Sequence, residues 1–362
     1  MTDDEATPDV KPEKAEPAFT PLGMPPASPI RSRDGDVIHT GPEFAVGEGD
    51  VRSAERSEVI IGTSLWRDAW RRLLKNKLAV FGMIVVAIIT LASLAGPYII
   101  KRTTGNTPDY IPADVLLLKS FPPFTAPDGS FSGKHPMGTD NQGRDLLARV
   151  LQGGQISLMV GIISTLVSLL IGVAYGAIAG YLGGRTDNVM MRVVDVLYSL
   201  PYVIIVIVLL SMFRSQTARG QLFLLFVALG SVSWLTMARI VRGQVLSLKN
   251  QEFVLAARAT GVSTAKIVFR HLVPNTLGPV IVYATLTIPT VMLTEAFLSF
   301  LGFGVQPPLA SWGSLATDGI QNIAIFPWQL VFPGVTMALT LFSLNFLGDG
   351  LRDALDPQMR KV

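Results

Sequence analysis

The chain has 362 residues, of which 49% are hydrophobic and 16% charged, and its mean hydropathy is +0.44. Because soluble domains carry about a quarter charged residues, this composition favours a protein that contacts lipid. The absence of cysteine excludes disulfide frameworks, thiolate nucleophiles and cysteine zinc sites. The three histidines, His39, His135 and His271, are too scattered to form a paired metal site.

The charges are divided unevenly along the chain. Residues 1–60 contain six Lys or Arg against thirteen Asp or Glu, together with eight of the 24 prolines, whereas residues 61–362 contain twenty-four basic and fourteen acidic side chains. A proline-rich acidic stretch cannot bury enough apolar surface to offset its ordering entropy. We therefore predict a disordered acidic tail over residues 1–62 and no cleavable secretory signal. Both a partner-binding tail and a solvated extension fit this composition.

Long uncharged runs follow the tail. A helix needs about 20 apolar residues to cross a hydrocarbon core of about 30 Å, and Leu78–Ile100 contains no Asp, Glu, Lys or Arg. The sequence therefore predicts an all-α integral membrane protein. The six predicted transmembrane helices lie near residues 78–100, 156–180, 194–213, 221–239, 276–300 and 328–349.

These spans divide the chain into five predicted regions. They are the acidic tail 1–62, a first transmembrane helix preceded by basic residues at 63–100, an extracytoplasmic loop at 101–150, a five-helix core at 151–350 that contains a long loop at 244–275, and a C-terminal segment at 351–362.

Basic residues near the span ends predict the orientation. The first span is preceded by Arg67, Arg71, Arg72, Lys75 and Lys77. This places the N-terminus in the cytoplasm, and six spans return the C-terminus to the same side. The loop between the fourth and fifth spans then faces the cytoplasm and carries six Lys or Arg, whereas residues 302–328 carry none. The loop at 101–149 departs from the rule with six basic residues, although it is long and also holds five Asp.

The chain contains no phosphate-binding loop of the pattern GxxxxGK[ST], so we expect it not to hydrolyse ATP. Coupled carriers place several ionisable groups inside the membrane. Here only Glu295 lies well within a predicted span, with Asp195 and Asp349 near span ends. A stand-alone secondary carrier is therefore disfavoured. Glu295 and Ser299 are candidates for a translocation path, and the alternative is a carboxylate that snorkels or is hydrogen-bonded near the outer interface.

The loop at 244–275 holds a predicted protrusion. Gln251–Thr260 has the composition of a short helix, Gly261 permits a sharp turn, and Ser263 or Thr264 can cap a second helix that ends before Pro274.

The small side chains of Ala256 and Ala257 would let this protrusion enter a groove on a partner. An interfacial amphipathic linker fits the same residues equally well.

Three features are predicted at the outer face. Gly138, Asp140, Arg144 and Asp145 lie in a polar stretch that predicts a tight turn, and two carboxylates are too few for a calcium loop. The fifth span is predicted to unwind around residues 299–304. Trp312 and Trp328 suit the headgroup level, as belt anchors or as contacts for an extracellular partner.

The protrusion resembles the EAA signature of ATP-binding cassette (ABC) importer permeases, in which Glu-Ala-Ala is followed by Gly. The signature falls on Leu255, Ala256, Ala257 and Gly261, and it closes on Val273 and Pro274. Leu255 stands where the family has Glu, while Glu252 lies one helical turn earlier. Arg258, Lys266 and Arg270 would face a docking partner or the phosphates of the inner leaflet.

Other stretches resemble the C-component permeases of the dipeptide, oligopeptide and nickel importers. These stretches are His135–Asp145 and residues 179–184, 192–201, 293–313 and 347–357. They occur in order and cover most of residues 73–360.

The resemblance implies a type I importer permease with a cytoplasmic coupling helix, in the plasma membrane of a bacterium. The implied coupling residues are Glu252, Leu255, Ala256, Ala257, Arg258, Gly261 and Pro274. The implied partners are a second six-span permease, two ATP-binding subunits or one fused ATPase, and an extracytoplasmic substrate-binding protein. Neither nucleic acid nor a metal site is expected.

The resemblance also implies that this chain has no catalytic residue and binds no cofactor, because ATP and Mg²⁺ are bound by the partner ATPases. Di- and oligopeptides are the expected cargo. Nickel and glutathione are the alternatives, since importers of both share this permease type.

Overall fold

Helices form almost all of the regular structure. The structure, a computed structural model, describes residues 65–111, 120–126 and 128–356, so the predicted acidic tail lies outside it. The described residues belong to one unit, Thr63–Val362. Within them the only β-type pairings are two isolated bridges, Thr125 with Phe131 and Thr139 with Asp145.

The elements are, in chain order, α2 (Leu65–Lys75), α3 (Lys77–Thr103), α4 (Leu146–Leu182), α5 (Gly184–Ser199), α6 (Tyr202–Met212), α7 (Ala218–Leu248), α8 (Glu252–Ala259), α9 (Thr264–Lys266), the π-helix η2 (Ile267–Leu272), α10 (Val273–Asn275), α11 (Leu277–Phe300), α12 (Trp312–Gln321) and α13 (Trp328–Leu355).

Five helices are long and apolar enough to cross a membrane, namely α3, α4, α7, α11 and α13. The bent pair α5 and α6 makes a sixth span if it is counted as one. The all-helical fold with six spans predicted from the sequence is thereby confirmed. α4 begins ten residues before the predicted start because the side chain of Asp145 accepts the Ala148 N–H and caps its first turn.

The third span is not the continuous helix that we predicted near 194–213. α5 and α6 meet at 85°, and Leu200 and Pro201 separate them. Pro201 has no backbone N–H to continue the helix, and it holds the preceding Leu200 in an extended conformation. The break divides this span into an amphipathic half, α5, and an apolar half, α6.

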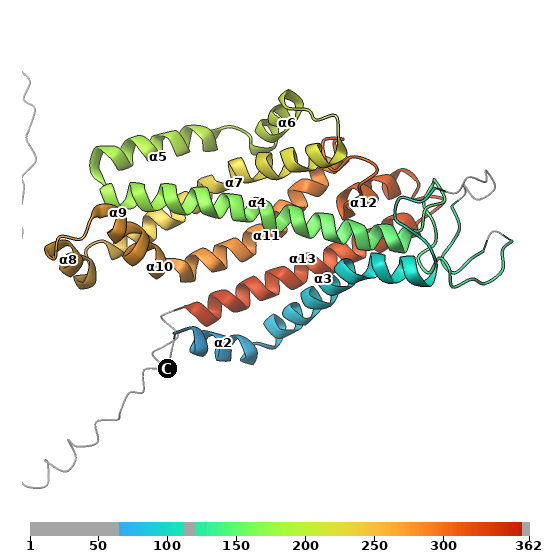
Figure 1. Cartoon of the computed structure of the whole chain (residues 1–362), viewed down its shortest axis with the longest axis horizontal. Coiled ribbons are helices and arrows are strands. Elements are labelled where there is room, and N and C mark those ends of the chain that lie inside the picture. Colours follow the sequence, from blue (N-terminus) through green and yellow to red (C-terminus); the bar gives the residue numbers. More distant parts are fainter. Residues whose placement is uncertain (1–64, 112–119, 127, 357–362) are drawn as a thin grey trace, which may run out of the picture. The chain divides into compact units, whose positions relative to one another are not determined.

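α4 runs through the middle of the bundle and packs most extensively on α7 (Figure 1). Gly172, Gly176 and Gly180 recur every four residues on the face of α4 that meets α7. A Cβ atom at Gly176 would overlap the carbonyl oxygen of Ala238. Small residues at this spacing let two helix backbones approach closely, which drives helix association in lipid. α3 and α13 pack against each other along the other side of α4 and α11 (Figure 1).

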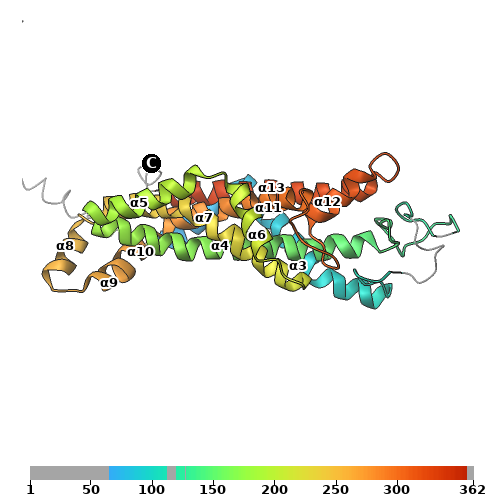
Figure 2. The same ribbon diagram turned by 90° about the horizontal axis from the view of Figure 1, so that it is seen from above.

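The bundle has two distinct ends. Figures 1 and 2 both place α8 and α9 at one end, here named the α8 end, and α12 at the other, named the α12 end.

Two helices were not predicted. The basic residues before the first span form α2, whose buried Leu73 packs on Ala79 and Ala354. Ser311 caps α12, and its Oγ accepts the Ser314 N–H at 3.0 Å. The prediction that Trp312 is a belt anchor is wrong, because the side chain is 0% exposed and its Nε1 donates to the Val150 carbonyl at 2.8 Å.

Candidate functional site

The segment Gln251–Asn275 projects from the α8 end and is named the knuckle here (Figure 2). The predicted short helix is present as α8. It ends at Ala259, two residues before Gly261, whose φ of +76° favours glycine. The Val262 N–H then donates to the Ala257 carbonyl at 3.1 Å, as in a Schellman motif. Gly261 therefore makes the turn that the sequence predicts.

The second helix of the knuckle does not end before Pro274, as we expected. Pro274 lies inside α10, directly after η2. The Val273 N–H donates to Val268, five residues earlier, so the chain forms a π-turn before it reaches the proline. A π-turn changes the hydrogen-bond pattern where Pro274 has no N–H to contribute, and the chain then continues into α11 with a single break at Thr276.

Packing divides the knuckle into an inner and an outer face. The buried side chains are Val254, Ala257, Ile267, Val268 and Leu272, which form one cluster with Val241 and Val245 of α7. The exposed side chains of α8 are Glu252, Phe253, Leu255, Ala256, Arg258 and Ala259. Leu255 is 48% exposed and Phe253 is 39% exposed. Ala256 and Ala257 therefore face opposite ways, and only Ala256 is open to a partner.

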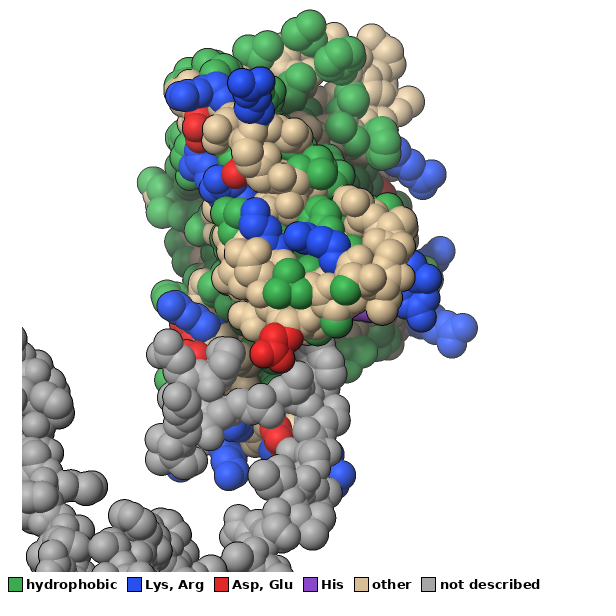
Figure 3. All heavy atoms as spheres, turned by 90° about the vertical axis from the view of Figure 1, so that its left-hand side faces the viewer, with side chains coloured by type: hydrophobic (Ala, Val, Ile, Leu, Met, Phe, Trp, Pro, Cys, Tyr) green, Lys and Arg blue, Asp and Glu red, His purple; other side chains and the backbone are tan. Residues whose placement is uncertain are grey.

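Among the charged side chains at the α8 end, Lys and Arg predominate (Figure 3). In and beside the knuckle these are Lys249, Arg258, Lys266 and Arg270, against Glu252 alone among the acidic residues from 249 to 275. The Arg258 guanidinium lies 5.3 Å from the centroid of the Tyr181 ring, so α8 also contacts the end of α4.

Ion pairs connect α5 to α7 near the same end. Arg242 donates from Nε and Nη2 to the two carboxylate oxygens of Asp187, at 2.5 and 2.6 Å. Arg239 donates to Asp195 at 2.9 Å and lies 4.2 Å from the centroid of the Tyr198 ring. The bidentate geometry at Asp187 is the stronger of the two pairings. These contacts hold the amphipathic half of the broken span against α7.

A cavity of about 520 Å³ lies between the broken span, α7 and α11, and it is named the inner cavity. Its lining is Leu197, Tyr198, Leu200, Tyr202, Val232, Ser233, Leu235, Thr236, Tyr283, Leu286, Thr287, Thr290, Val291 and Thr294. No lining side chain is charged, but eight carry hydroxyl groups. The cavity therefore combines apolar walls with groups that donate and accept hydrogen bonds.

Sequence reasoning missed the inner cavity. Its signal is the spacing of Tyr283, Thr287, Thr290 and Thr294, which places four hydroxyl side chains on one face of α11.

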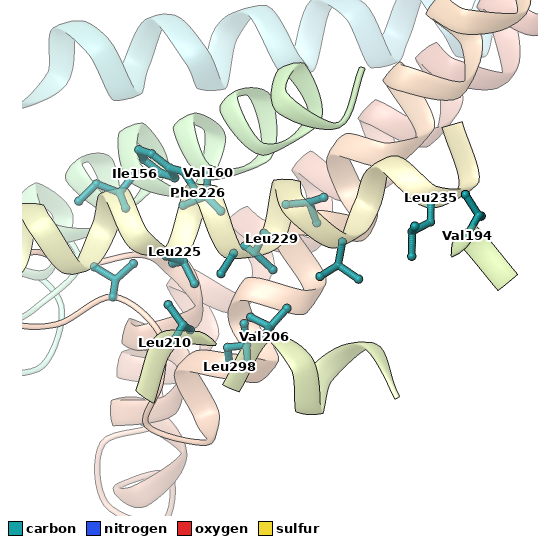
Figure 4. Close-up of a cluster of buried hydrophobic side chains, with 14 residues drawn as sticks. Ile156, Val160, Val194, Val206, Leu210, Leu225, Phe226, Leu229, Leu235 and Leu298 are labelled. Carbon is teal, nitrogen blue, oxygen red and sulfur yellow. The ribbon is translucent and has the colours of Figure 1, made fainter. Parts of the chain in front are cut away.

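A buried apolar cluster follows the inner cavity along α6, α7 and α11. Val206, Leu210, Leu225, Leu229 and Leu298 gather between α6, α7 and α11, and they are named the plug (Figure 4). Each of them is 2% exposed or less.

Beyond the plug lies a second cavity of about 600 Å³, named the outer pocket. Its lining is Leu210, Ser211, Arg214, Ser215, Gln216, Thr217, Ala218, Gln221, Gly302, Phe303, Gln306 and Pro307. These residues come from the end of α6, the start of α7 and the segment after α11.

Glu295 and Ser299, the predicted path residues, line neither cavity. Glu295 is 1% exposed, and its Oε1 accepts the hydroxyl groups of Ser299 and Ser311, both at 2.7 Å. The carboxylate thus joins α11 to Ser311, the N-cap of α12. α11 unwinds just after Ser299 as expected, because Gly302 adopts a φ of +84°.

The polar stretch after His135 forms a tight turn on α4. Asp140 accepts the Arg144 Nε at 2.7 Å and the Arg149 Nη1 at 2.6 Å. Asp145 caps α4 and contacts His135 Nδ1 at 3.2 Å. Gly138 adopts a φ of +77° beside the carbonyl of Phe121.

The turn packs on α12. Burial raises the pKa of Asp318 above its ordinary value, while the charges of Arg149 and Arg144 oppose that rise. Among the residues that the structure describes, no three His, Asp or Glu side chains are grouped to hold a metal ion.

Two family patterns match the chain. Residues 172–361 match the binding-protein-dependent transport system inner membrane component family. Residues 64–123 match the N-terminal transmembrane domain of oligopeptide transport permease C.

Individual proteins resemble the chain over most of its length. It is 46% identical to the oligopeptide transport system permease protein OppC of Haemophilus influenzae, over 83% of this chain and 90% of that one. It is 49% identical to OppC of Escherichia coli K12, over 83% and 93%. It is 44% identical to the dipeptide transport system permease protein DppC of Bacillus subtilis, over 82% and 87%.

Among solved structures, an inward-facing methionine ABC transporter, MetNI, aligns with a TM-score of 0.47 at 20% identity. The alignment covers 58% of this chain and 96% of that one.

Proposed function

Because the chain belongs to the binding-protein-dependent transport system inner membrane component family, we propose that it is one of two membrane subunits in an ATP-driven importer. ATP hydrolysis, with its Mg²⁺, takes place on separate ATPase subunits, since the chain has no phosphate-binding loop. A substrate-binding protein delivers the cargo from outside. The observation that carries this proposal is the exposed knuckle, which offers a docking helix and no chemistry of its own.

The α8 end faces the cytoplasm in this proposal. The abundance of Lys and Arg on the knuckle supports this orientation, because basic residues favour the cytoplasmic side. The helix α8 inserts its outer face into a groove of the ATPase. Glu252 and Ala256 lie one helical turn apart, so they share that face.

Coupling follows from the way the knuckle is built into the bundle. Its inner face packs on α7, and its second helix leads into α11, and both of these helices line the inner cavity. A displacement of α8 by the closing ATPase is therefore passed to two walls of the cavity. Moving a two-state equilibrium from 1:99 to 99:1 requires about 5.5 kcal/mol of differential binding.

Peptides are the proposed cargo. The relatives named above are oligopeptide and dipeptide permeases, and each matches more than four fifths of this chain. The hydroxyl-lined inner cavity supports this choice, since it offers hydrogen bonds to a peptide backbone without selecting a side-chain charge. We propose that it forms one wall of the pathway, with the second permease subunit forming the other.

The test uses the reconstituted complex of permeases, ATPases and binding protein. Leu255→Asp introduces a charge at the exposed centre of α8, and Ser247→Asp introduces the same charge at an exposed position in the last turn of α7, outside the knuckle. We expect Leu255→Asp to abolish the peptide-stimulated ATPase activity and Ser247→Asp to retain it. Normal stimulation in Leu255→Asp would contradict the docking role. Uptake of labelled nickel but not of labelled di- to oligopeptides would contradict the cargo.

A further inference from the structure

We propose that the outer pocket binds the carboxylate of an arriving peptide, with Arg214 as its charged partner. This inference rests on the proposed import of peptides and assigns the first contact of the cargo with this chain.

The charge of the outer pocket points to an anion. Arg214 is the single ionisable side chain among the residues that line it. Within the described part of the chain, no carboxylate lies within ion-pair distance of Arg214, although four other arginines pair with aspartates. The lining also includes neutral polar side chains, among them Ser211, Gln216 and Gln306. A guanidinium without a carboxylate partner binds a carboxylate through charge-assisted, often bidentate hydrogen bonds.

The loop that carries Arg214 is held in place by its own hydrogen bonds. Gln221 is 9% exposed and accepts the Ser215 N–H through Oε1 at 3.1 Å. Ser215 Oγ accepts the Thr217 N–H at 3.3 Å, and Thr217 Oγ1 accepts the Gly220 N–H at 3.1 Å. Arg214 therefore projects from an ordered base, which lowers the entropic cost of binding a ligand.

The position of the pocket matches an arriving substrate. Three elements, α6, α7 and α11 with the segment after it, each contribute residues first to the inner cavity, then to the plug and then to the outer pocket. α6 supplies Tyr202, Val206 and Leu210 in this order. α7 supplies Ser233, Leu229 and Gln221 from the cavity outward.

α11 and the segment after it supply Thr294, Leu298 and Gly302 in the same way. The inner cavity, the plug and the outer pocket therefore follow one another along the same three elements. A ligand in the outer pocket is the next to enter the inner cavity when the plug opens.

The size of the pocket suits one end of a peptide. Its volume of about 600 Å³ lies within the range of about 300–1,000 Å³ that is typical of small-ligand sites. A peptide of any sequence carries one C-terminal carboxylate, so a site for this group accepts cargo of varied side chains.

The experiment compares two forms of one tripeptide, trialanine with a free carboxylate and trialanine amide, in ATP-driven uptake by the reconstituted complex. Arg214→Gln removes the charge from the pocket. Arg219→Gln removes a neighbouring exposed charge that does not line it. For each peptide, the uptake rate of a variant is divided by the uptake rate of the wild type. Any preference of the binding protein for one of the two peptides then cancels.

We expect Arg214→Gln to lower uptake of the free acid at subsaturating concentration by about tenfold, the size of one charge-assisted hydrogen bond. In the same variant, uptake of the amide changes less than twofold. Arg214→Lys keeps part of the preference for the free acid over the amide. Arg219→Gln leaves both peptides unchanged.

Two results overturn the inference. Equal loss for both peptides, with a higher binding-protein concentration needed for half-maximal uptake, would assign Arg214 to an acidic side chain of the binding protein. Unchanged uptake of both peptides in Arg214→Gln would remove it from the pathway. Both results are compatible with the proposed import of peptides. A wild-type complex that imports neither peptide would contradict the proposed function, and this inference with it.

Discussion

The carboxylate of Glu295 joins two helices and lines neither the inner cavity nor the outer pocket. Its Oε1 accepts one hydroxyl from its own helix and one from Ser311 at the start of α12. Ser311 Oγ in turn accepts the Ser314 N–H. A buried carboxylate is stabilised only when such donors surround it. The role of Glu295 is therefore to fix α12 to the end of α11.

Replacing Ser311 tests this role. Ser311→Ala removes the helix cap and one donor to Glu295, and we expect it to lower the free energy of unfolding by about 1–3 kcal/mol. The matched control is Thr317→Ala, because Thr317 Oγ1 donates only to the Gly313 carbonyl of its own helix. Thermal unfolding of the purified protein in detergent compares the two. Equal melting temperatures would contradict the link.

Gly138 is required for its conformation and for its close packing. Its φ is +77°, and a Cβ atom there would lie 2.5 Å from the Phe121 carbonyl oxygen. Gly129 has a similar φ of +83° but nothing within 4 Å of that position.

Both Gly138→Ala and Gly129→Ala therefore carry the strain of a positive φ, about 1–2 kcal/mol. We expect the free energy of unfolding to be lower in Gly138→Ala than in Gly129→Ala by about 1–3 kcal/mol, the usual cost of overpacking. The difference between the melting temperatures of the two variants measures this cost. A melting temperature of Gly129→Ala at or below that of Gly138→Ala would mean that the contact with the Phe121 carbonyl does not destabilise the Gly138→Ala variant.

At the scale of elements, the pairing of α4 with α7 organises the bundle. Gly172, Gly176 and Gly180 bring the two backbones together, and α7 then holds α5 through the pair of Arg242 with Asp187. The inner cavity lies on the other side of α7, so its width depends on this contact.

A methyl group at Gly176 tests the contact. Gly176→Ala would push α4 away from the Ala238 carbonyl, whereas Gly243→Ala on α7 meets nothing within 4 Å. Alanine favours helix at both positions, by about 1 kcal/mol. We therefore expect Gly176→Ala to lower the melting temperature and Gly243→Ala to keep or raise it. A higher melting temperature for Gly176→Ala would show that the helices can separate without cost.

The straight spans could be predicted from the sequence because each is encoded by one local run of uncharged residues. The break in the third span could not be read from composition, since the run continues through it, although Pro201 carries the signal. The short helix α12 lacks a long apolar run, and only Ser311 marks its start.

The candidate site shows the same division between local and distant causes. The turn at Gly261 depends on one residue and could be predicted. The burial of Ala257 depends on its packing against α7 and could not. The inner cavity needs three elements that are distant in sequence, so only the hydroxyl stripe of α11 was open to sequence reasoning.

At the scale of the whole molecule, the plug lies between the inner cavity and the outer pocket along α6, α7 and α11. Its side chains come from α6, α7 and α11, and none is charged. Apolar side chains packed without voids exclude water and polar solutes. We therefore expect the plug to close this side of the proposed pathway in the resting complex, and to open when the knuckle at the α8 end moves.

Leu229→Ala thins the plug, and we expect it to let a small polar dye leak from proteoliposomes that contain the complex without ATP. Leu344→Ala is the matched control, because Leu344 is similarly buried but belongs to the cluster around Trp312. Each substitution costs about 2–5 kcal/mol of stability, so gel filtration must show that both complexes remain assembled. Leakage should rise with Leu229→Ala alone, because only this side chain lies between the two cavities. Equal leakage in the two variants would mean that any loss of core packing lets the dye through. The cluster of Val206, Leu210, Leu225, Leu229 and Leu298 would then not be the barrier to the dye.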